Sequence, residues 1–218
     1  DKTKDGINVQ NNGKFYGWTE KEEIKNAFNV NWNINFEKPV VFVEGETDEL
    51  YLKTAKEILN HEDVDIQIKW IGRINEQGSR EFTGDTGLNH TKSFILANKE
   101  ILNQKTILLY DSDTNKKAKN YDNLYIRSMP RNNDNELFKK GIENLLSLPN
   151  DFPRDNFYKK INNETESKYG EKKVINREKL DKKKLCSWIC KEISEEKQIK
   201  YLKNFEPVLK MIGKIIEN

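Results

Sequence analysis

Two compact runs of apolar residues interrupt an otherwise polar chain, and both have the length and composition of buried β-strands. Residues 39–43 are Pro-Val-Val-Phe-Val, and residues 106–110 are Thr-Ile-Leu-Leu-Tyr. Because neither run alternates with polar positions, each is typical of a strand covered on both faces, as in a parallel sheet. Residues 65–71 do alternate, which predicts a half-exposed strand near a sheet edge, and residues 124–127 predict a fourth, shorter strand.

Helical spacing of apolar positions follows the strands. The spacing predicts helices over about residues 48–60, with Thr47 as the N-cap, and 88–102, with a glycine-punctuated loop before the second helix. Strands that alternate with helices favour an α/β fold with a mostly parallel central sheet flanked by helices. In such a sheet, ligands bind at the carboxyl ends of the strands.

The carboxyl-terminal third of the chain predicts mainly helices. A helical segment over residues 136–146 stops at Pro149, and residues 150–180 are charged and show no clear period. Helices are expected near residues 182–194, after an Asp181 cap, and near 207–217.

These elements predict three parts of the chain. A capping-box pattern at Thr19 favours a short helix in the polar amino-terminal part. The expected organisation is an N-terminal tail with a short helix (1–37), an α/β domain (38–148), and a C-terminal helical appendage packed on that domain (149–218).

Charge and composition narrow the possible classes of function. The chain has 38 basic and 36 acidic side chains, so its net charge of +2 does not mark it as a nucleic-acid or membrane binder. No run of about 18 apolar residues is present, and the amino end lacks a signal-peptide pattern, so we expect a cytoplasmic protein without a membrane partner. The chain begins at Asp1 rather than Met, and further domains in a longer protein stay open.

The cysteines and histidines do not predict a site. Cys186 and Cys190 lie four residues apart without the further ligands of a zinc site, and such a helical pair has poor disulfide geometry. His61 and His90 are isolated in polar helical surroundings and are expected at the surface. Asp85 lies between glycines, and turn chemistry explains it as well as a role at the sheet edge.

Acidic side chains follow both buried strands. They are Glu44, Glu46, Asp48 and Glu49 after the first strand, and Asp111 and Asp113 after residues 106–110. Because the carboxyl ends of parallel strands meet at one edge, we expect these acids to lie together. Carboxylates that repel one another need cations, and oxygen ligands select Mg²⁺ or Mn²⁺. From the residues alone, a divalent-metal site and simple helix capping remain equal alternatives.

Two motifs resemble those of the TOPRIM domain: Val40-Val-Phe-Val-Glu44-Gly45-Glu-Thr-Asp48 and Ile107-Leu-Leu-Tyr-Asp111-Ser-Asp113. This domain is shared by topoisomerases, bacterial primases, RNA-processing nucleases and the OLD (overcoming lysogenization defect) family of nucleases. The resemblance covers about residues 38–148. The Glu-Gly-x-Thr-Asp form, and the absence of a Gly and a further acid after Asp113, favour the OLD branch. Residues 141–146 and the start of the helix after Asp181 also resemble the carboxyl end of that branch.

The resemblance implies a metal-dependent DNA endonuclease that uses Mg²⁺ or Mn²⁺, with two ions. In this interpretation Glu44 and Asp48 bind one metal region, Asp111 and Asp113 bind another, and Glu143 is an additional acid. Two ions can activate a water and stabilise both the attacking and the leaving oxygen of a phosphodiester.

The resemblance also implies a catalytic lysine. Lys182, or Lys183 as an alternate, would stabilise the pentacovalent phosphate. In a chain with 38 basic residues, a solvated surface position stays open for either lysine. The candidates for contacts with nucleic-acid phosphates are Lys116, Lys117, Lys119, Arg127 and Lys183.

The resemblance further suggests a partner and a biological setting. OLD nucleases usually carry an ATPase domain, but this chain has no Gly-x-x-x-x-Gly-Lys-Ser/Thr phosphate loop, so an ATPase would lie on an absent segment or subunit. Defence against phage is the expected setting, and a homo-oligomer stays open.

Two alternative functions stay open. One is a primase-like or RNA-cleaving TOPRIM protein, against which the missing downstream acid argues. The other is a non-catalytic module whose acidic edge docks a partner, against which the complete set of acids argues.

Overall fold

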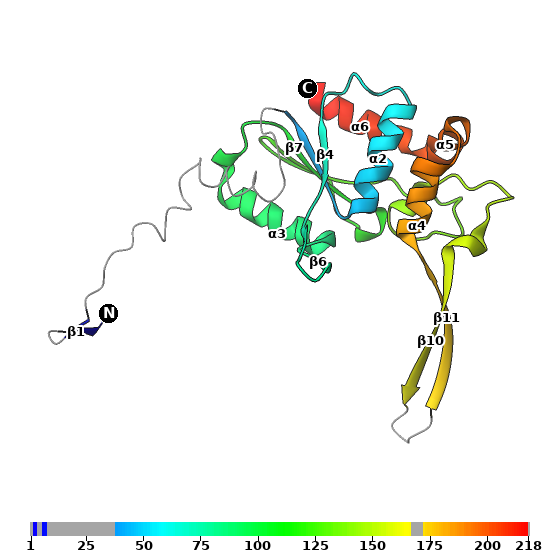
Figure 1. Ribbon diagram of the computed structural model, residues 1–218. Helices are drawn as coiled ribbons and strands as arrows, with labels where there is room; N and C mark the ends of the chain where they lie inside the picture. The colour runs from blue at the N-terminus through cyan, green and yellow to red at the C-terminus, as the bar shows by residue number, and fades with distance from the viewer. Residues whose placement is uncertain (1, 4–5, 8–37, 167–171, 218) are drawn as a thin grey trace.

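A five-stranded mixed sheet forms the centre of the computed structural model, which describes residues 2–3, 6–7, 38–166 and 172–217 (Figure 1). The strand order is β4-β3-β7-β9-β8; the first four strands run parallel, and β8 runs antiparallel to β9 at one edge. The strands are β3 Val40–Val43, β4 Gln67–Trp70, β7 Thr106–Tyr110, β8 Lys119–Tyr121 and β9 Leu124–Ser128. This arrangement confirms the α/β class, the mostly parallel sheet and the edge position of the strand expected over residues 65–71.

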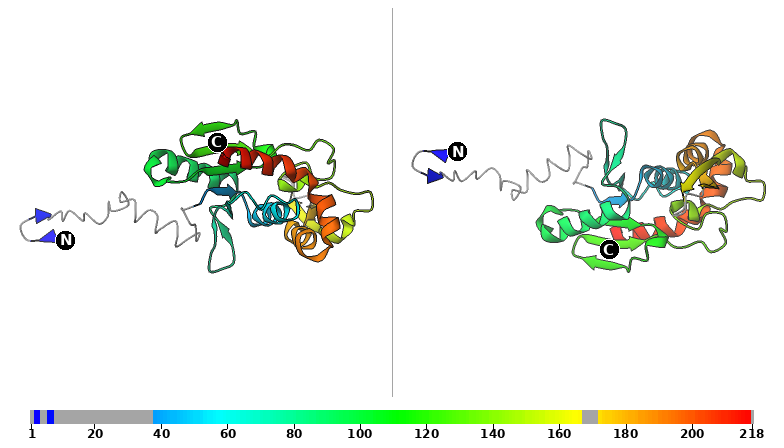
Figure 2. Two further views of the ribbon diagram at one scale, coloured as in Figure 1. Left: turned by 90° about the horizontal axis from the view of Figure 1, so that it is seen from above. Right: turned by 90° about the horizontal axis from the view of Figure 1, so that it is seen from below.

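Helices cover both faces of the sheet. They are α2 Glu46–Ile58, α3 Gly84–Ala97, α4 Lys182–Ser187, α5 Glu195–Leu202 and α6 Glu206–Glu217. Seen along the strands, α3 lies on one side of the sheet and the other helices lie on the opposite side (Figure 2). None of the helices in the described ranges has the length and apolar character needed to cross a membrane.

Alternation along β3 divides the core between the two faces. Val40 and Phe42 pack in the cluster that includes α3, whereas Val41 and Val43 pack with α2 and the C-terminal helices. Successive strand residues point to opposite faces, so a strand without polar positions needs cover on both sides. The C-terminal helices supply much of that cover, for example through Phe205, which is fully buried.

The predicted helices shift at their ends for identifiable reasons. The helix expected from residue 48 begins at Glu46, because the Asp48 carboxylate accepts a hydrogen bond from the Gly45 N–H at 2.8 Å; Thr47 is not the cap. The helix expected over residues 88–102 is α3, followed by a 3₁₀ turn at Lys99–Ile101.

The helical segment expected over residues 136–146 is wrong except for a 3₁₀ turn at Ile142–Leu145. Two buried asparagines replace the helical hydrogen bonds in this region. The Asn135 side chain donates to the carbonyl oxygens of three residues, including Glu143, and the Asn144 side chain donates to Phe138 O. Side-chain amides of this kind compete with regular structure for the backbone.

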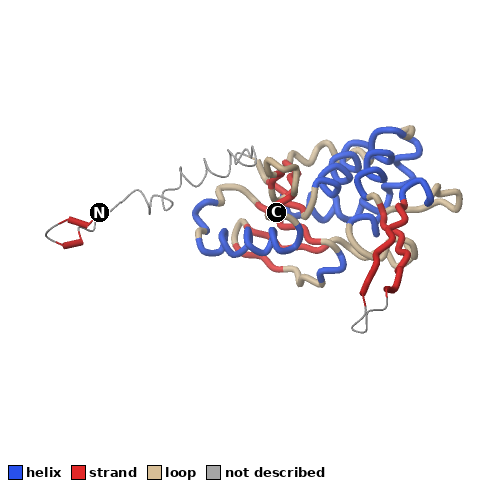
Figure 3. The backbone as a smooth tube through the Cα atoms, turned by 60° about the horizontal axis from the view of Figure 1, so that its bottom comes forward, coloured by secondary structure: helices blue, strands red, loops and turns tan. Residues whose placement is uncertain are grey.

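The charged residues before α4 form a hairpin that the sequence pattern does not predict. Strands β10 (Tyr158–Glu166) and β11 (Lys172–Leu180) pair antiparallel after a 3₁₀ turn at Arg154–Phe157 and extend away from the helices (Figure 3). The Asp181 cap is confirmed, because its carboxylate accepts from Lys184 N at 3.1 Å. The helix expected over 182–194 is α4 continued by a π-helical turn at Trp188–Glu192, and α5 and a 3₁₀ turn at Lys203–Phe205 precede α6.

Short hairpins complete the described fold. Strands β5 (Arg73–Ile74) and β6 (Arg80–Glu81) form a hairpin in the glycine-punctuated loop, and β1 (Lys2–Thr3) pairs with β2 (Gly6–Ile7). A 3₁₀ turn at Ser112–Thr114 follows β7. The helix expected after Thr19 lies outside the described residues.

The outer edge of β4 is partly closed by a side chain. Gln67 donates its N–H to Pro39 O, and Ile71 donates its N–H to Val43 O. Because backbone N–H groups alternate in direction along a strand, the Trp70 N–H points away from β3. This amide donates to the Glu49 carboxylate of α2 at 2.7 Å.

Two glycines inside helices give a matched test of packing. A Cβ on Gly87 in α3 would lie 2.1 Å from the backbone oxygen of Phe82, whereas a Cβ on Gly213 in α6 would make an ordinary 3.6 Å contact with Val64. We expect Gly87→Ala to lower the free energy of unfolding by roughly 1–3 kcal/mol through overpacking. Gly213→Ala should raise it by about 0.5–1 kcal/mol through helix propensity. Urea denaturation measures both, and shifts of the same sign would contradict this packing.

Candidate active site

The carboxyl ends of β3 and β7 bring Glu44 and Asp111 together. Each residue directly follows its strand, and the two strands are parallel neighbours. The Asp111 N–H donates to Glu44 Oε1 at 3.0 Å, which connects the two strand ends directly. The Glu44 side chain is therefore held at the edge where a parallel sheet binds its ligands.

The first turn of α2 adds Asp48 to the same edge. Its side chain is buried, with 6% of the residue exposed, and it caps the helix through the Gly45 N–H. The short connection between β3 and α2 therefore places two acids side by side, Glu44 at the strand end and Asp48 inside the helix.

A 3₁₀ turn supplies a third acid and leaves room for a lysine. Glu143 is fully buried, and its Oε2 lies 2.8 Å from Lys182 Nζ. Gly141 has a φ of +73°, and a Cβ there would lie 2.7 Å from Glu143 Oε2 and 2.8 Å from Lys182 Nζ. Glycine is needed at this position both for the backbone conformation and for the approach of the two charged groups.

Lys182 is the first residue of α4, and the Asp181 cap fixes where that helix begins. Its side chain is 52% exposed, so the ammonium group reaches solvent while it contacts the buried acid. Burial lowers the pKa of Lys182, but Glu143, Asp48 and Asp111 together raise it above the usual value. Lys182 therefore stays protonated at neutral pH.

The acids at this edge hold protons more tightly than ordinary carboxylates. Burial, with the neighbouring Glu143 charge, raises the pKa of Asp48 to about 7. Burial, with the charges of Asp48 and Glu44, raises the pKa of Asp111 to about 9. Burial also raises the pKa of Glu44, against the hydrogen bond from Asp111 N–H that lowers it. The single nearby lysine does not neutralise all these carboxylates.

Carboxylate oxygens without partners also indicate that this edge has too little positive charge for its acids. Asp111 Oδ1 and Glu143 Oε1 are buried and have no hydrogen-bond partner among the described residues. Within the described ranges, however, no three His, Cys, Asp or Glu side chains are grouped so that they could hold a metal ion as they stand. A metal held by these acids would need side-chain rearrangement around Lys182.

Two further acids lie at the outer rim. Asp113 is exposed, and its Oδ1 accepts from the Gly141 N–H at 3.3 Å. Asp85 lies in the first turn of α3, and both acids contribute to the raised pKa of Glu44. The sequence pattern predicts that this helix begins at residue 88, four residues later than it does, and therefore places Asp85 in a turn before the helix.

Of the basic side chains expected to contact nucleic acid, some are free in solvent and others contact groups of the protein itself. Lys117 and Lys119 are exposed. Lys116 Nζ donates to the Asn89 side chain at 3.2 Å, and Arg127 donates to Lys119 O at 3.1 Å. Lys183 Nζ lies 3.1 Å from Glu46 Oε2. These internal contacts leave Lys117 and Lys119 as the freest candidates of the set for a phosphate chain.

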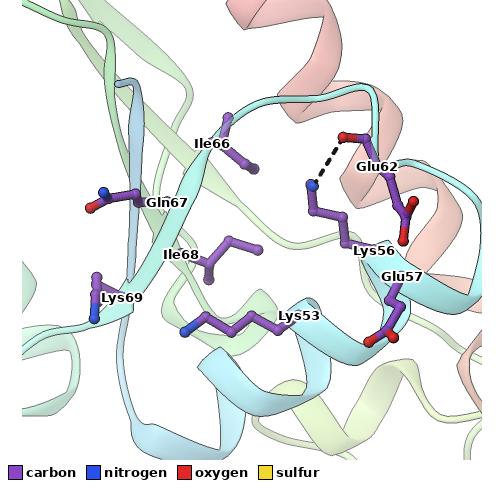
Figure 4. A pocket seen from close by; sticks show the side chains of 8 residues that line it. All are labelled: Lys53, Lys56, Glu57, Glu62, Ile66, Gln67, Ile68 and Lys69. Atoms are coloured by element: carbon purple, nitrogen blue, oxygen red, sulfur yellow. Dashed lines mark hydrogen bonds between the residues drawn. The ribbon is translucent and has the colours of Figure 1, made fainter. Parts of the chain in front are cut away.

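The main hollows of the surface lie away from the acids. One of about 520 Å³ lies between α2 and the open edge of β4, where lysines, glutamates and two isoleucines line it (Figure 4). Another of about 700 Å³ lies between β9 and α6, with Arg127 and Lys210 among its lining residues. Neither hollow is lined by Glu44, Asp48, Asp111 or Glu143, and the edge that carries these four residues, called the acidic edge below, is the candidate site.

The β5–β6 hairpin is a part of the rim that the sequence does not reveal. Arg80 of this hairpin pairs with Glu46 in the first turn of α2. Phe82 follows β6 with a φ of +57° and is 64% exposed. Such a conformation in a bulky residue costs about 1–3 kcal/mol. No sequence pattern marked Phe82, because a single exposed aromatic in a loop has no periodicity.

Comparison with models of known protein families, with curated proteins and with solved structures finds no match to this chain.

The raised pKa values predict how stability depends on pH without added metal. The folded state holds protons on Asp48 and Asp111 above the ordinary carboxyl value of 3.8, so these groups stabilise the fold fully below that pH. Their contribution is lost as pH rises through about 7 for Asp48 and about 9 for Asp111. We expect the free energy of unfolding to fall between pH 5 and 9, and Asp111→Asn to flatten that fall. Denaturation at several pH values measures this, with the exposed Asp134→Asn as control; a parent curve that rises over this range would contradict it.

Proposed function

We propose that this chain is a metal-dependent DNA endonuclease with a TOPRIM-like catalytic domain of the OLD type. The observation that carries the proposal is the convergence of buried acids with raised pKa values beside Lys182 at the carboxyl edge of a parallel sheet. Perturbed acids in such a position are typical of active sites. The resemblance of the two acidic motifs supports the same class, and it extends the proposal to phage defence and to an ATPase on another segment or subunit.

The donor chemistry of this edge suits Mg²⁺ or Mn²⁺, although the acids would have to rearrange around Lys182 to bind an ion. Oxygen donors predominate, and Asp111 Oδ1 is a buried acceptor that has no hydrogen-bond partner among the described residues. Glu44, Asp48 and Asp111 would hold metal, and Asp113 and Glu143 are further acids for a second ion. A bound ion would supply Lewis acidity at the phosphate and lower the pKa of a water molecule.

The chain's own residues would orient the phosphate and stabilise its charge. Lys182 places a protonated ammonium group at the edge with half of its side chain exposed, where it can donate to a phosphate oxygen. The ion pair of Lys183 with Glu46 favours Lys182 for this role. Glu143 holds Lys182 in place, and Gly141 keeps the space between them open.

Two alternative functions differ from this proposal in what the chain binds and whether it is cleaved. A primase-like or RNA-cleaving protein would use the same acids on another nucleic acid or in another reaction. A docking module would bind a partner chain without hydrolysis.

The acids give the first test of the proposed reaction. With supercoiled plasmid and Mg²⁺ or Mn²⁺, we expect nicking by the parent and none with a chelator. Glu44→Gln and Asp111→Asn should each lower the rate by at least about a hundredfold, since each removes a charge that holds a cation. The same metals should raise the melting temperature of the parent. Asp134→Asn is the matched control; equal cutting by all variants would show that these acids are misassigned.

The lysine gives the second test, with its neighbour as control. Lys182→Ala should lower turnover by roughly 10²–10³-fold with little change in DNA affinity, because its donor acts on charge that develops in the transition state. Lys183→Ala should cut at close to the parent rate. Steady-state kinetics on plasmid and binding at several salt concentrations separate the two effects. A loss of affinity and of salt dependence, with turnover unchanged, would make Lys182 a simple phosphate contact.

A further inference from the structure

An exposed aromatic side chain lies at the rim of the acidic edge. Among the described residues, the large hydrophobic side chains that remain exposed are Ile74, Phe82 and Ile199, and Phe82 is the most exposed. Gly84, two residues after Phe82, donates its N–H to Glu44 O at 2.9 Å. The ring therefore belongs to a segment that is hydrogen-bonded to the candidate site.

The backbone at Phe82 is held by two close approaches. A Cβ on Gly87 would lie 2.1 Å from Phe82 O, and a Cβ on Gly72 would lie 2.5 Å from Glu81 O. The fold keeps Phe82 at a positive φ that bulky residues disfavour, yet most of its surface stays in water. Burial of the ring does not account for this arrangement.

One basic group lies over the ring, and a second belongs to the same hairpin. The Arg73 guanidinium lies 5.5 Å from the centroid of Phe82 and pairs with Glu81 at 2.9 Å. Arg80 of the same hairpin pairs with Glu46 in the first turn of α2, so it lies between the ring and the candidate site. An exposed aromatic ring with a basic residue beside it is a combination that binds single-stranded nucleic acid, with phosphates near the charge and bases on the ring.

The direction of the hairpin agrees with this use. In Figure 1, β4 leads down into the β5–β6 hairpin, which extends from the side of the molecule where α2 begins. The longer β10–β11 hairpin extends toward the same side. The acidic edge therefore lies on the side from which both hairpins project.

We propose that Phe82, with Arg73 behind it, is a stacking platform for an unpaired nucleobase next to the phosphate held at the acidic edge. The inference deepens the proposed nuclease function and rests on it: the preferred substrate is single-stranded or locally unpaired DNA. Phe82 is a positioning residue in this arrangement. Stacking on an aromatic face tolerates any base, so the platform selects unpaired structure rather than sequence.

Binding of matched oligonucleotides tests the platform. The probes are a fluorescein-labelled single-stranded DNA and the same strand with abasic sites at its central positions, in Ca²⁺, which takes the same oxygen ligands. We expect Phe82→Ala to weaken binding about tenfold on the complete strand and to have no effect on the abasic strand. Phe82→Trp should bind like the parent. Ile199→Ala, an exposed apolar change on α5, is the matched control and should leave both affinities unchanged.

A second variant separates loss of the stacking ring from loss of folding. Phe82→Gly removes the ring and also relieves the positive φ, so its melting temperature should equal or exceed that of the parent while base-dependent binding falls. A lower melting temperature together with an equal loss of binding on both strands would assign Phe82 a structural role and overturn the platform.

The remaining outcomes separate this inference from the nuclease proposal. A parent that cuts plasmid while Phe82→Ala binds both strands like the parent keeps the nuclease and overturns the platform. If Phe82→Ala shows the base-dependent loss of binding but the parent never cuts, the platform is kept and the nuclease reaction is overturned. A parent that does not bind single-stranded DNA overturns the platform and leaves Phe82 as a contact for a protein partner.

Discussion

The ion pair between buried Glu143 and Lys182 is the interaction on which the arrangement of the candidate site depends. A carboxylate removed from water needs a countercharge, and breaking such a pair leaves an uncompensated charge inside the protein. Lys182 comes from a helix almost forty residues further along the chain, so α4 must reach the sheet edge to provide it. Helices α5 and α6 follow α4 and pack through apolar side chains on the face of the sheet that α3 does not cover.

One lysine among several acids leaves this edge electrostatically incomplete. Asp48 and Asp111 compensate by retaining protons, as their raised pKa values indicate, and some carboxylate oxygens stay without partners among the described residues. A fold optimised for stability alone would replace such groups with apolar ones. This excess of acids is typical of a site at which a bound cation stabilises the carboxylates.

The sequence predicted the parts of the fold in which local pattern and tertiary structure agree. The runs at Val40–Val43 and Thr106–Tyr110 read as buried strands because both faces are covered, and their parallel pairing puts Glu44 and Asp111 at one edge. The β10–β11 hairpin was not predictable, since its charged residues show no alternation that marks a buried face. The acids were recognisable by their motifs, but the contact of Glu143 with Lys182 depends on tertiary packing. Phe82 was missed for another reason: a single exposed aromatic has no periodicity, and its positive φ, next to the close approaches at Gly72 and Gly87, does not appear in the pattern.

The Glu49 carboxylate that accepts the Trp70 N–H has a consequence for self-association. An open strand edge is a template onto which another chain can add a strand, and such pairing leads to aggregation. In β4, the amide nearest the acidic edge is already bound by a charged side chain from α2. A second molecule that approached this edge would have to displace a carboxylate from its hydrogen bond, and Lys53 holds that carboxylate in place through an ion pair at 2.6 Å. The helix that contributes Asp48 to the candidate site therefore also makes this end of β4 a poorer template for an added strand.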